Sequence, residues 1–352
     1  MEILSFIIPF IILLTVVVFI HEYGHYYFAK RYGVGVTDFS IGFGKEIFGF
    51  NDKSGTRWKF CLIPLGGYVK FFGDRNVFSQ AEQEELLKKY SEEDQKKLFV
   101  TKPLYQRSLV VAAGPLANFA LAILIFSFIY MFAGKDFTPA QIQEVQKDGP
   151  AYSSGIKAGD IILSINNKKV NSILEVSTYI NTASTENIDI KVLRNSNEII
   201  LNVTPMIVKG EDSLGNKVNK KIIGIKISPL NSEFNRERLG PATALFYAVK
   251  ETWFVTMASL DFIASMFKGK GDTTQLGGPI KIAKITGQVA QHGFIAFLSI
   301  MAYISISLGF INLFPIPMLD GGHLMFYAFE KILGRPLTQR TQEGFFRIGL
   351  FL

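Results

Sequence analysis

The chain has very few of the side chains that most often bind transition metals: one cysteine and four histidines in 352 residues. A single cysteine excludes an internal disulfide and any zinc site built from several thiolates. Charge is also scarce, because 19% of the residues are charged whereas 48% are hydrophobic. With a mean hydropathy of +0.24, this composition indicates a membrane protein that carries a soluble module rather than one globular domain.

Three apolar segments are long enough to cross the roughly 30 Å hydrocarbon core of a bilayer: Ile3–Ile20, Leu109–Ala133 and Phe294–Leu319. A fourth, Leu245–Phe267, contains three charged residues and places its apolar residues on one stripe at helical spacing. That pattern predicts an amphipathic helix on a membrane surface rather than a span. Together the segments predict a mainly α-helical transmembrane core.

The net charge of +7 indicates orientation in a bilayer rather than nucleic-acid binding, because the basic residues follow the apolar segments. Lys30–Arg107 is predicted to be cytoplasmic and the region after the second span external. The expected parts are a membrane core at 1–133, an external domain at 134–230, a connecting segment at 231–293 and a second membrane core at 294–352. We expect a lipid bilayer as a partner and no nucleic acid.

The sequence His21-Glu22-Tyr23-Gly24-His25 directly follows the first apolar run. Side chains at positions i and i+4 project from one helix face, so His21 and His25 can bind one Zn²⁺ while Glu22 serves as general base. The alternative is a chance occurrence of the motif. However, two imidazoles and a carboxylate are expensive in a spanning helix, and ionisable residues there predict a function.

A catalytic zinc needs a third protein ligand. Asp320 is the only acid in the apolar stretch that begins at Phe294, and a metal removes the cost of an unpaired carboxylate there. We therefore predict Asp320 as the third ligand. Two alternatives stay open: His323 as the ligand instead, and Asp320 as a helix-end residue at the membrane interface.

Between the first two spans, Val36–Phe50 and Arg57–Phe72 alternate apolar and polar residues around Asn51–Thr56. They predict an antiparallel hairpin. The apolar centre of the second strand, Phe60–Val69, is too short to span a bilayer. Non-helical backbone at membrane depth needs hydrogen bonds from protein or water for its N–H and C=O groups. We therefore expect a re-entrant, membrane-associated hairpin beside the active site. Gln80–Lys97 is predicted to be a solvated helix.

The external region shows a globular pattern of short strands and one helix. The run from Gly155 to Asn166, GIKAGDIILSIN, resembles the core of a bacterial, circularly permuted PDZ domain, and the resemblance extends over Thr138–Ile227. It implies an α+β domain with a possible bound peptide. No carboxylate-binding loop of the GLGF type is evident, so a steric plug or spacer is equally open.

Three motifs occur in order: HEYGH, then Gly114-Pro115-Leu116-Ala117-Asn118, then Asn312 with Asp320-Gly321. With them, the chain resembles a bacterial site-2 protease of the RseP type, from Met1 to about Leu352. The resemblance implies an intramembrane zinc metalloendopeptidase that cleaves single-span substrates such as anti-sigma factors or remnant signal peptides. It implies zinc held by the two histidines of the first motif and Asp320, with the glutamate of that motif as base.

The same resemblance implies a multi-pass protein of the bacterial inner membrane, with the active site toward the cytoplasm and a periplasmic PDZ domain that gates substrate access. It implies substrate contacts by Asn312 and by the strand at Gly66-Gly67-Tyr68, and Asn118 is a further candidate. The alternatives are an ordinary interhelical contact for Asn312 and close helix packing for Gly114 and Asn118.

The chain departs from well-studied relatives in two places. It has room for one PDZ-like module instead of two, and the apolar run Phe345–Leu352 is too short for a last spanning helix, which we therefore expect to be incomplete. Two other functional classes stay open: a membrane adaptor that tethers partners without catalysis, and a metal transporter or sensor. A complete zinc set at one membrane depth favours the protease.

Overall fold

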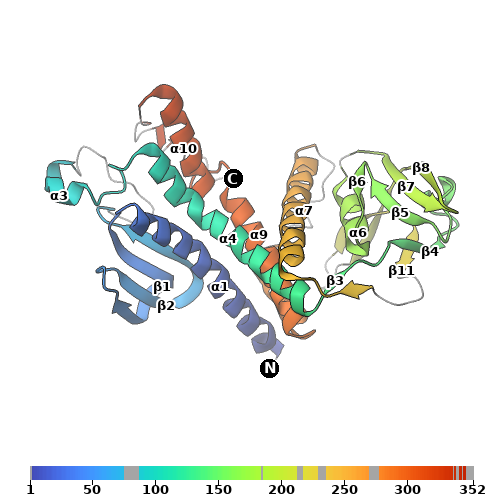
Figure 1. Cartoon of the computed structure of the whole chain (residues 1–352), viewed down its shortest axis with the longest axis horizontal. Helices are drawn as coiled ribbons and strands as arrows, with labels where there is room; N and C mark the ends of the chain where they lie inside the picture. The colour runs from blue at the N-terminus through green and yellow to red at the C-terminus, as the bar shows by residue number, and fades with distance from the viewer. Residues whose placement is uncertain are drawn as a thin grey trace. The chain divides into compact units, whose positions relative to one another are not determined.

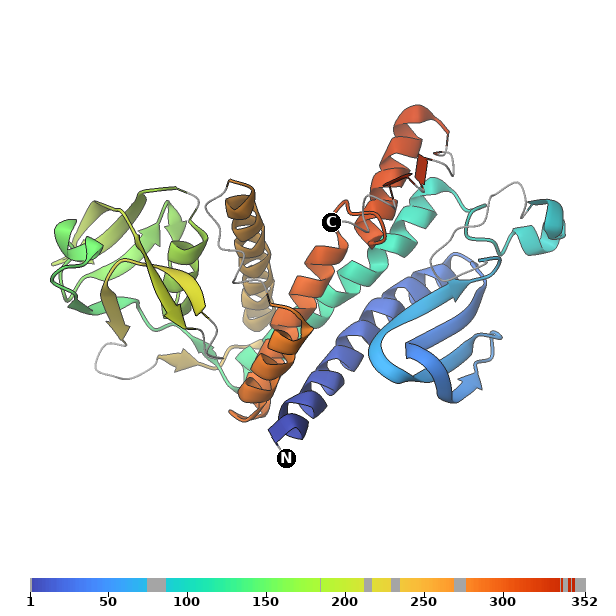
Figure 2. The same ribbon diagram turned by 180° about the vertical axis from the view of Figure 1, so that it is seen from behind.

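The computed structural model describes residues 2–74, 87–183, 185–211, 217–228, 235–268, 277–335, 337, 341–342 and 344–345. The chain forms two compact units (Figures 1 and 2). One comprises Met1–Ile125 together with Thr286–Leu352, and the other comprises Phe126–Ile285.

The first unit is built on three apolar helices: α1 (Glu2–Arg31), α4 (Leu104–Phe132) and α9 (Phe294–Asn312). Among the described residues, these are the helices long and apolar enough to cross a membrane, in agreement with the three predicted spans. α1 and α4 run side by side in both views (Figures 1 and 2). Glycines allow the close approach, since a Cβ at Gly24 would lie 2.9 Å from Ala117 Cβ, and one at Gly309 2.9 Å from the Pro115 carbonyl oxygen.

α9 ends at Asn312 rather than at the predicted Leu319, because Pro315 and Pro317 cannot continue a helix. The chain turns, and α10 (Asp320–Leu333) then begins. Asp320 is therefore the first residue of a new helix rather than the last residue of a span. Gly322 packs closely on the turn, since a Cβ there would lie 2.5 Å from the Ile316 carbonyl oxygen.

The predicted hairpin is present as β1 (Val36–Asn51) and β2 (Arg57–Phe71). Both strands bend, and the first half of β1 pairs with both halves of β2: Ser40 lies opposite Lys59 and also opposite Tyr68. The bend in β2 includes Gly66, whose φ of 140° favours glycine. The sheet thus has its middle strand in β1 and the second half of β2 at one edge.

Aromatic rings hold this sheet on α1. The rings of Phe39 and Trp58 stack at 4.2 Å between centroids, and Phe19 of α1 meets Phe39 edge-on at 5.8 Å. Several large apolar side chains of the sheet remain exposed: Ile47, Phe48, Leu62, Ile63 and Leu65. Of the predicted solvated helix at Gln80–Lys97, residues 80–86 lie outside the described residues, and the rest contains the short α3 (Glu92–Gln95).

The second unit contains a six-stranded sheet with the order β11-β4-β5-β7-β8 and β6 paired to β5. We call Gln141–Ser228 the β domain. Its strands are β4 (Gln141–Val145), β5 (Ile161–Ile165), β6 (Lys168–Lys169), β7 (Ile188–Arg194), β8 (Asn197–Val203) and β11 (Ile225–Ser228), with helices α5 (Pro150–Ser153) and α6 (Ile173–Thr182). The hairpin β9 (Met206–Glu211) and β10 (Lys217–Ile222) and the pair β3 (Lys135–Asp136) and β12 (Arg236–Glu237) complete the strands. Alternate isoleucines of the central strands form a dry core.

A buried ion pair fixes the GIKAGD turn of the β domain. The Arg194 guanidinium donates from Nε and Nη2 to the two carboxylate oxygens of Asp160, each at 2.7 Å. The Lys157 backbone N–H donates to the same carboxylate at 2.9 Å. Burial alone would raise the pKa of Asp160, but these hydrogen bonds outweigh it and hold that pKa below its usual value.

The doubtful fourth segment forms α7 (Pro241–Phe267), which is not among the described helices that qualify as membrane spans. One stripe of apolar residues on α7 is exposed: Leu245, Phe246, Val249, Trp253, Leu260 and Phe267. Other α7 residues face the β domain, since Phe254 meets Tyr179 edge-on at 5.4 Å and Asp261 pairs with Lys168. α8 (Pro279–Ala290) follows. Of the predicted incomplete helix, residues 346–352 lie outside the described residues.

Candidate metal centre

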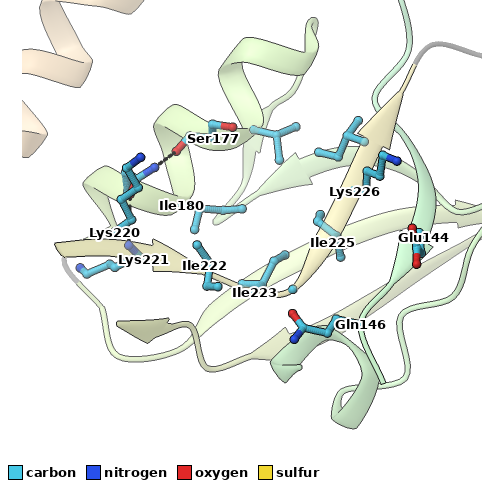
Figure 3. Close-up of a pocket in the computed structure, with 14 residues that line it drawn as sticks. Glu144, Gln146, Ser177, Ile180, Lys220, Lys221, Ile222, Ile223, Ile225 and Lys226 are labelled. Carbon is cyan, nitrogen blue, oxygen red and sulfur yellow. Dashed lines mark hydrogen bonds between the residues drawn. The ribbon is translucent and has the colours of Figure 1, made fainter. Parts of the chain in front are cut away.

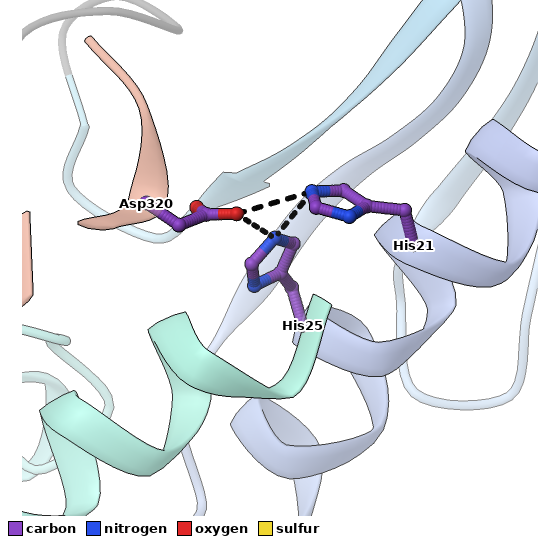
Figure 4. A group of neighbouring side chains, drawn as sticks. All are labelled: His21, His25 and Asp320. Carbon is purple, nitrogen blue, oxygen red and sulfur yellow. Dashed lines mark hydrogen bonds and ion pairs between the residues drawn. The ribbon is translucent and has the colours of Figure 1, made fainter. Parts of the chain in front are cut away.

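His21, His25 and Asp320 converge on one point (Figure 4). The two Nε2 atoms lie 3.2 Å apart. Asp320 Oδ2 lies 3.2 Å from Nε2 of His21 and 3.5 Å from Nε2 of His25. Both imidazoles are buried, with 8% and 9% of their residue surfaces exposed. The structure thus brings together the three side chains that the sequence predicts as zinc ligands.

The spacing of these atoms fits a zinc ion. Tetrahedral zinc with ligand distances of about 2.0–2.1 Å holds its ligand atoms about 3.3 Å from one another, and the three measured separations lie close to that value. Asp320 Oδ2 is buried and receives no hydrogen bond from any described residue. A metal ion at this point would take Asp320 as a carboxylate and both imidazoles in their neutral form.

Helix α4 forms the wall behind the histidine rings. Gly114 makes this possible, because a Cβ at that position would lie 2.9 Å from Cε1 of His21 and 2.5 Å from Cε1 of His25. Nδ1 of His25 lies 2.9 Å from the Val110 carbonyl oxygen. Because the carbonyl only accepts, Nδ1 of His25 carries the proton and Nε2 presents its lone pair to the metal position.

Asn118 also belongs to this wall. Its side-chain amide nitrogen lies 3.4 Å from Nδ1 of His21, and the residue is fully buried. The sequence motif places Asn118 among candidate substrate contacts, whereas the structure places it behind the His21 ring.

A second contact to α4 fixes the helix that carries Asp320. Arg107 of α4 donates from Nη1 and Nη2 to the two carboxylate oxygens of Glu330 in α10, at 3.1 and 2.5 Å. The same guanidinium lies 5.1 Å from the centroid of the Tyr327 ring. Both charged side chains are largely buried. The pair joins two segments 223 positions apart in sequence, and sequence patterns gave no indication of it.

Glu22 lies on the side of α1 that faces β2. The Val69 backbone lies near the Glu22 carboxyl, and a Cβ at Gly67 would lie 3.1 Å from Glu22 Cγ. Tyr68 stacks on Phe43 with 6.2 Å between ring centroids. The strand segment Gly66-Gly67-Tyr68 therefore runs directly beside the predicted base.

Two further candidates lie near this site in sequence. Asn312 is the last residue of α9 and is partly buried. His323 lies one turn after Asp320 in α10, and burial lowers the pKa of its imidazole, which favours the neutral form. The cluster of potential ligand atoms found in the described part of the chain contains Asp320 and not His323.

Two histidines and a carboxylate between apolar helices, with a glutamate next to the first histidine, are the arrangement expected of a membrane-embedded metallopeptidase. The chain belongs to Peptidase family M50, whose sequence pattern matches residues 9–352.

Several bacterial relatives are similar over almost the whole chain. A protein named "Putative zinc metalloprotease" from Mesorhizobium japonicum is 41% identical and covers 99% of this chain and 95% of the relative. A protein of the same description from Rickettsia conorii is 38% identical, and the match covers 98% of this chain and 94% of the relative. "Metalloprotease MmpA" from Caulobacter vibrioides is 34% identical, over 99% and 92%.

Among solved structures, the PDZ domain of an SdrC-like protein from Listeria monocytogenes matches 26% of this chain and 88% of its own length. The sequence identity is 21% and the TM-score is 0.21. A PDZ domain from Listeria innocua matches at 24% identity with a TM-score of 0.20.

Proposed function

We propose that this chain is an intramembrane zinc metalloendopeptidase that hydrolyses a peptide bond in the membrane-spanning segment of a single-span substrate. The observation that carries the proposal is the triangle of His21, His25 and Asp320, whose separations fit one tetrahedral zinc. The position of the two histidines inside the candidate span Ser5–Arg31 supports a substrate within the membrane. The relatives named zinc metalloproteases support the choice of metal.

The roles of the residues follow from their positions. His21, His25 and Asp320 would hold the zinc, which when bound polarises the scissile carbonyl and activates water. Glu22 adjoins the first ligand, takes a proton from the attacking water and delivers it to the amide nitrogen of the leaving group.

The substrate segment must leave its helical conformation before its carbonyls can be attacked. The second half of β2 is an edge of the described sheet, because its paired residues all lie in β1. Gly67 lies close to the predicted base, since a Cβ there would be 3.1 Å from Glu22 Cγ, and backbone groups two residues apart on a strand share an edge. We infer that an unwound substrate adds as a strand along Gly66-Gly67-Tyr68, beside Glu22, with Asn312 as a second contact.

The membrane placement is inferred from charge and apolar surface. The Lys- and Arg-rich stretch Lys30–Arg107 supports a cytoplasmic active-site side in a bacterial inner membrane, with the β domain in the periplasm. The exposed apolar side chains of the β1–β2 sheet support its re-entry into the membrane. Substrates of the anti-sigma-factor or remnant-signal-peptide type fit this topology, because each presents one span.

The test is to incubate the purified full chain with a single-span substrate that lacks its external domain, and to locate the cut by mass spectrometry. We expect a cut within the span that a zinc chelator abolishes and added zinc restores. The control substrate carries the same sequence with its span replaced by a soluble linker, and it should stay intact. A cut outside the span, or one insensitive to the chelator, contradicts the proposal.

A second candidate function is peptide binding by the β domain, and a specific groove favours it (Figure 3). A cavity of about 590 Å³ lies between α6 and the strands β10 and β11, with Ile180 on one side and Ile225 on the other. Among the described residues β11 is an edge strand of the sheet, which supports the addition of an extended peptide along it. Lys220, Lys221 and Lys226 line the groove and favour an acidic peptide.

We infer that this groove recognises an extended segment of the substrate or of a regulator, and that occupancy gates access to the active site. Fluorescence polarisation with labelled acidic peptides tests the binding. Lys226→Glu should weaken it because it reverses a charge that lines the groove, whereas the control Lys209→Glu, at an exposed position of β9 outside the lining, should not. Equal loss in both variants, or binding unaffected by Lys226→Glu, excludes the groove as the site.

A further inference from the structure

The two histidines of the HEYGH motif are held by the same helix through different groups. Nδ1 of His25 faces a main-chain acceptor, the Val110 carbonyl, at 2.9 Å. Nδ1 of His21 faces a side chain, the amide of Asn118, at 3.4 Å. Only the second contact depends on the identity of a side chain.

A neutral imidazole that binds a metal through Nε2 must carry its proton on Nδ1. The Nδ1–H of His21 therefore needs a hydrogen-bond acceptor. The amide nitrogen of Asn118 cannot accept, but its Oδ1 can, and Oδ1 is buried without a hydrogen-bond partner among the described residues. A half-turn of the amide about its last bond exchanges the two atoms. It gives Oδ1 a donor and at the same time fixes the tautomer of His21.

The surroundings hold Asn118 where this exchange can occur. Ser305 Oγ of α9 donates to the Asn118 backbone carbonyl at 2.8 Å, and a Cβ at Gly309 would lie 3.2 Å from Asn118 Cβ. The residue is 0% exposed. The side chain is thus sealed from solvent between three helices, with its amide beside the His21 ring.

We propose that Asn118 is a positioning residue: its Oδ1 accepts the Nδ1–H of His21 and so directs the Nε2 lone pair of His21 at the zinc. The inference rests on the proposed zinc site. An acceptor behind a metal-binding histidine fixes the ring orientation and raises the basicity of the ligand, and its loss commonly weakens metal binding by about 10–100-fold.

The experiment compares four full-length proteins in detergent: wild type, Asn118→Leu, Asn118→Asp and Ser305→Ala. Leucine has a similar volume and no acceptor, whereas aspartate has the same shape and two acceptor oxygens. Ser305→Ala removes a hydrogen bond to Asn118 that does not touch His21, and so it controls for packing. Zinc affinity is measured by competition with a chromophoric chelator, and the visible absorption of the Co²⁺-loaded proteins reports the strength of the ligand field.

We expect Asn118→Leu to bind zinc about 10–100-fold more weakly than wild type, and Asn118→Asp and Ser305→Ala to bind within about threefold of it. The Co²⁺ bands of Asn118→Asp should shift, because a carboxylate makes His21 a stronger donor, while those of Ser305→Ala should coincide with wild type. Wild-type affinity in Asn118→Leu overturns the proposal. So does a loss in Asn118→Asp of tenfold or more, which tests the acceptor even where Asn118→Leu fails to fold. Absence of zinc from wild type instead refutes the proposed function.

Discussion

Replacement of Gly114 by alanine tests the wall behind the metal centre with a single methyl group. The new Cβ would lie 2.9 Å from Cε1 of His21, 2.5 Å from Cε1 of His25 and closer still to Nε2 of His25, whereas carbon atoms in contact lie about 3.5–4.0 Å apart. If contacts settle at the lower limit of about 3.5 Å, the His21 ring must retreat from α4 by about 0.6 Å and the His25 ring by about 1.0 Å or more. Metal–ligand distances tolerate about 0.2 Å, so the displacement removes the ligands from their positions.

We expect Gly114→Ala to weaken zinc binding by about 10–100-fold, which is a loss of about 1.4–2.7 kcal/mol of binding free energy. At limiting zinc, the cleavage rate should fall in the same proportion. Helix propensity works in the opposite direction, because alanine favours a helix over glycine by about 1 kcal/mol. The assay is chelator competition, with circular dichroism to verify the fold.

The matched control is Gly287→Ala in α8. Its Cβ would clash with Cβ and Cα of Phe6 in α1, about four helical turns before His21, so it crowds a contact between helices without meeting a proposed zinc ligand or Asn118. It should lower thermal stability more than zinc affinity. The reasoning is refuted if Gly114→Ala binds zinc within twofold of wild type, or if both variants lose zinc equally.

Two further predictions concern ion pairs. Arg107→Met and Glu330→Met should each lower the free energy of unfolding by about 3–5 kcal/mol, because each leaves a buried charge unpaired. The double variant should lose less than the sum of the two single losses, which thermal unfolding in detergent measures. Asp160 has a folded pKa below its unfolded value of about 3.9, so its stabilisation is present above that pH and is lost as pH falls toward the folded pKa. Arg194→Met should destabilise at neutral pH and flatten the acid dependence of stability, measured by unfolding between pH 2 and pH 6.

The sequence predicted best those helices and strands that have a long apolar run or a regular alternation of apolar and polar residues. The apolar runs became α1, α4 and α9, and alternation placed β1 and β2 within one residue of their observed ends. The third apolar segment continues to Leu319, but its helix α9 ends at Asn312, before Pro315 and Pro317, whose rings cannot continue a helix. Hydropathy measures solvent preference, and helix ends depend on hydrogen bonds.

The sequence predicted which side chains would bind the metal and that they would lie at a similar depth in the membrane. It did not predict the contacts that hold those side chains in place. His21 and His25 share a face by helical spacing alone, so their proximity was accessible from sequence. The hydrogen bond from Nδ1 of His25 to the Val110 carbonyl could not be predicted from sequence, because every residue has a main-chain carbonyl and only packing selects this one. The Arg107–Glu330 pair likewise joins positions whose separation in sequence carries no pattern.

The central claim is most directly tested by one comparison: zinc content and turnover of the purified full chain with Glu22 intact and with Glu22→Gln. Glutamine keeps the size of the side chain and removes its ability to take a proton. The account predicts about one zinc per chain in both proteins, by the three-ligand geometry, and cleavage of the single-span substrate only by wild type. Cleavage by Glu22→Gln at a rate near wild type would contradict it.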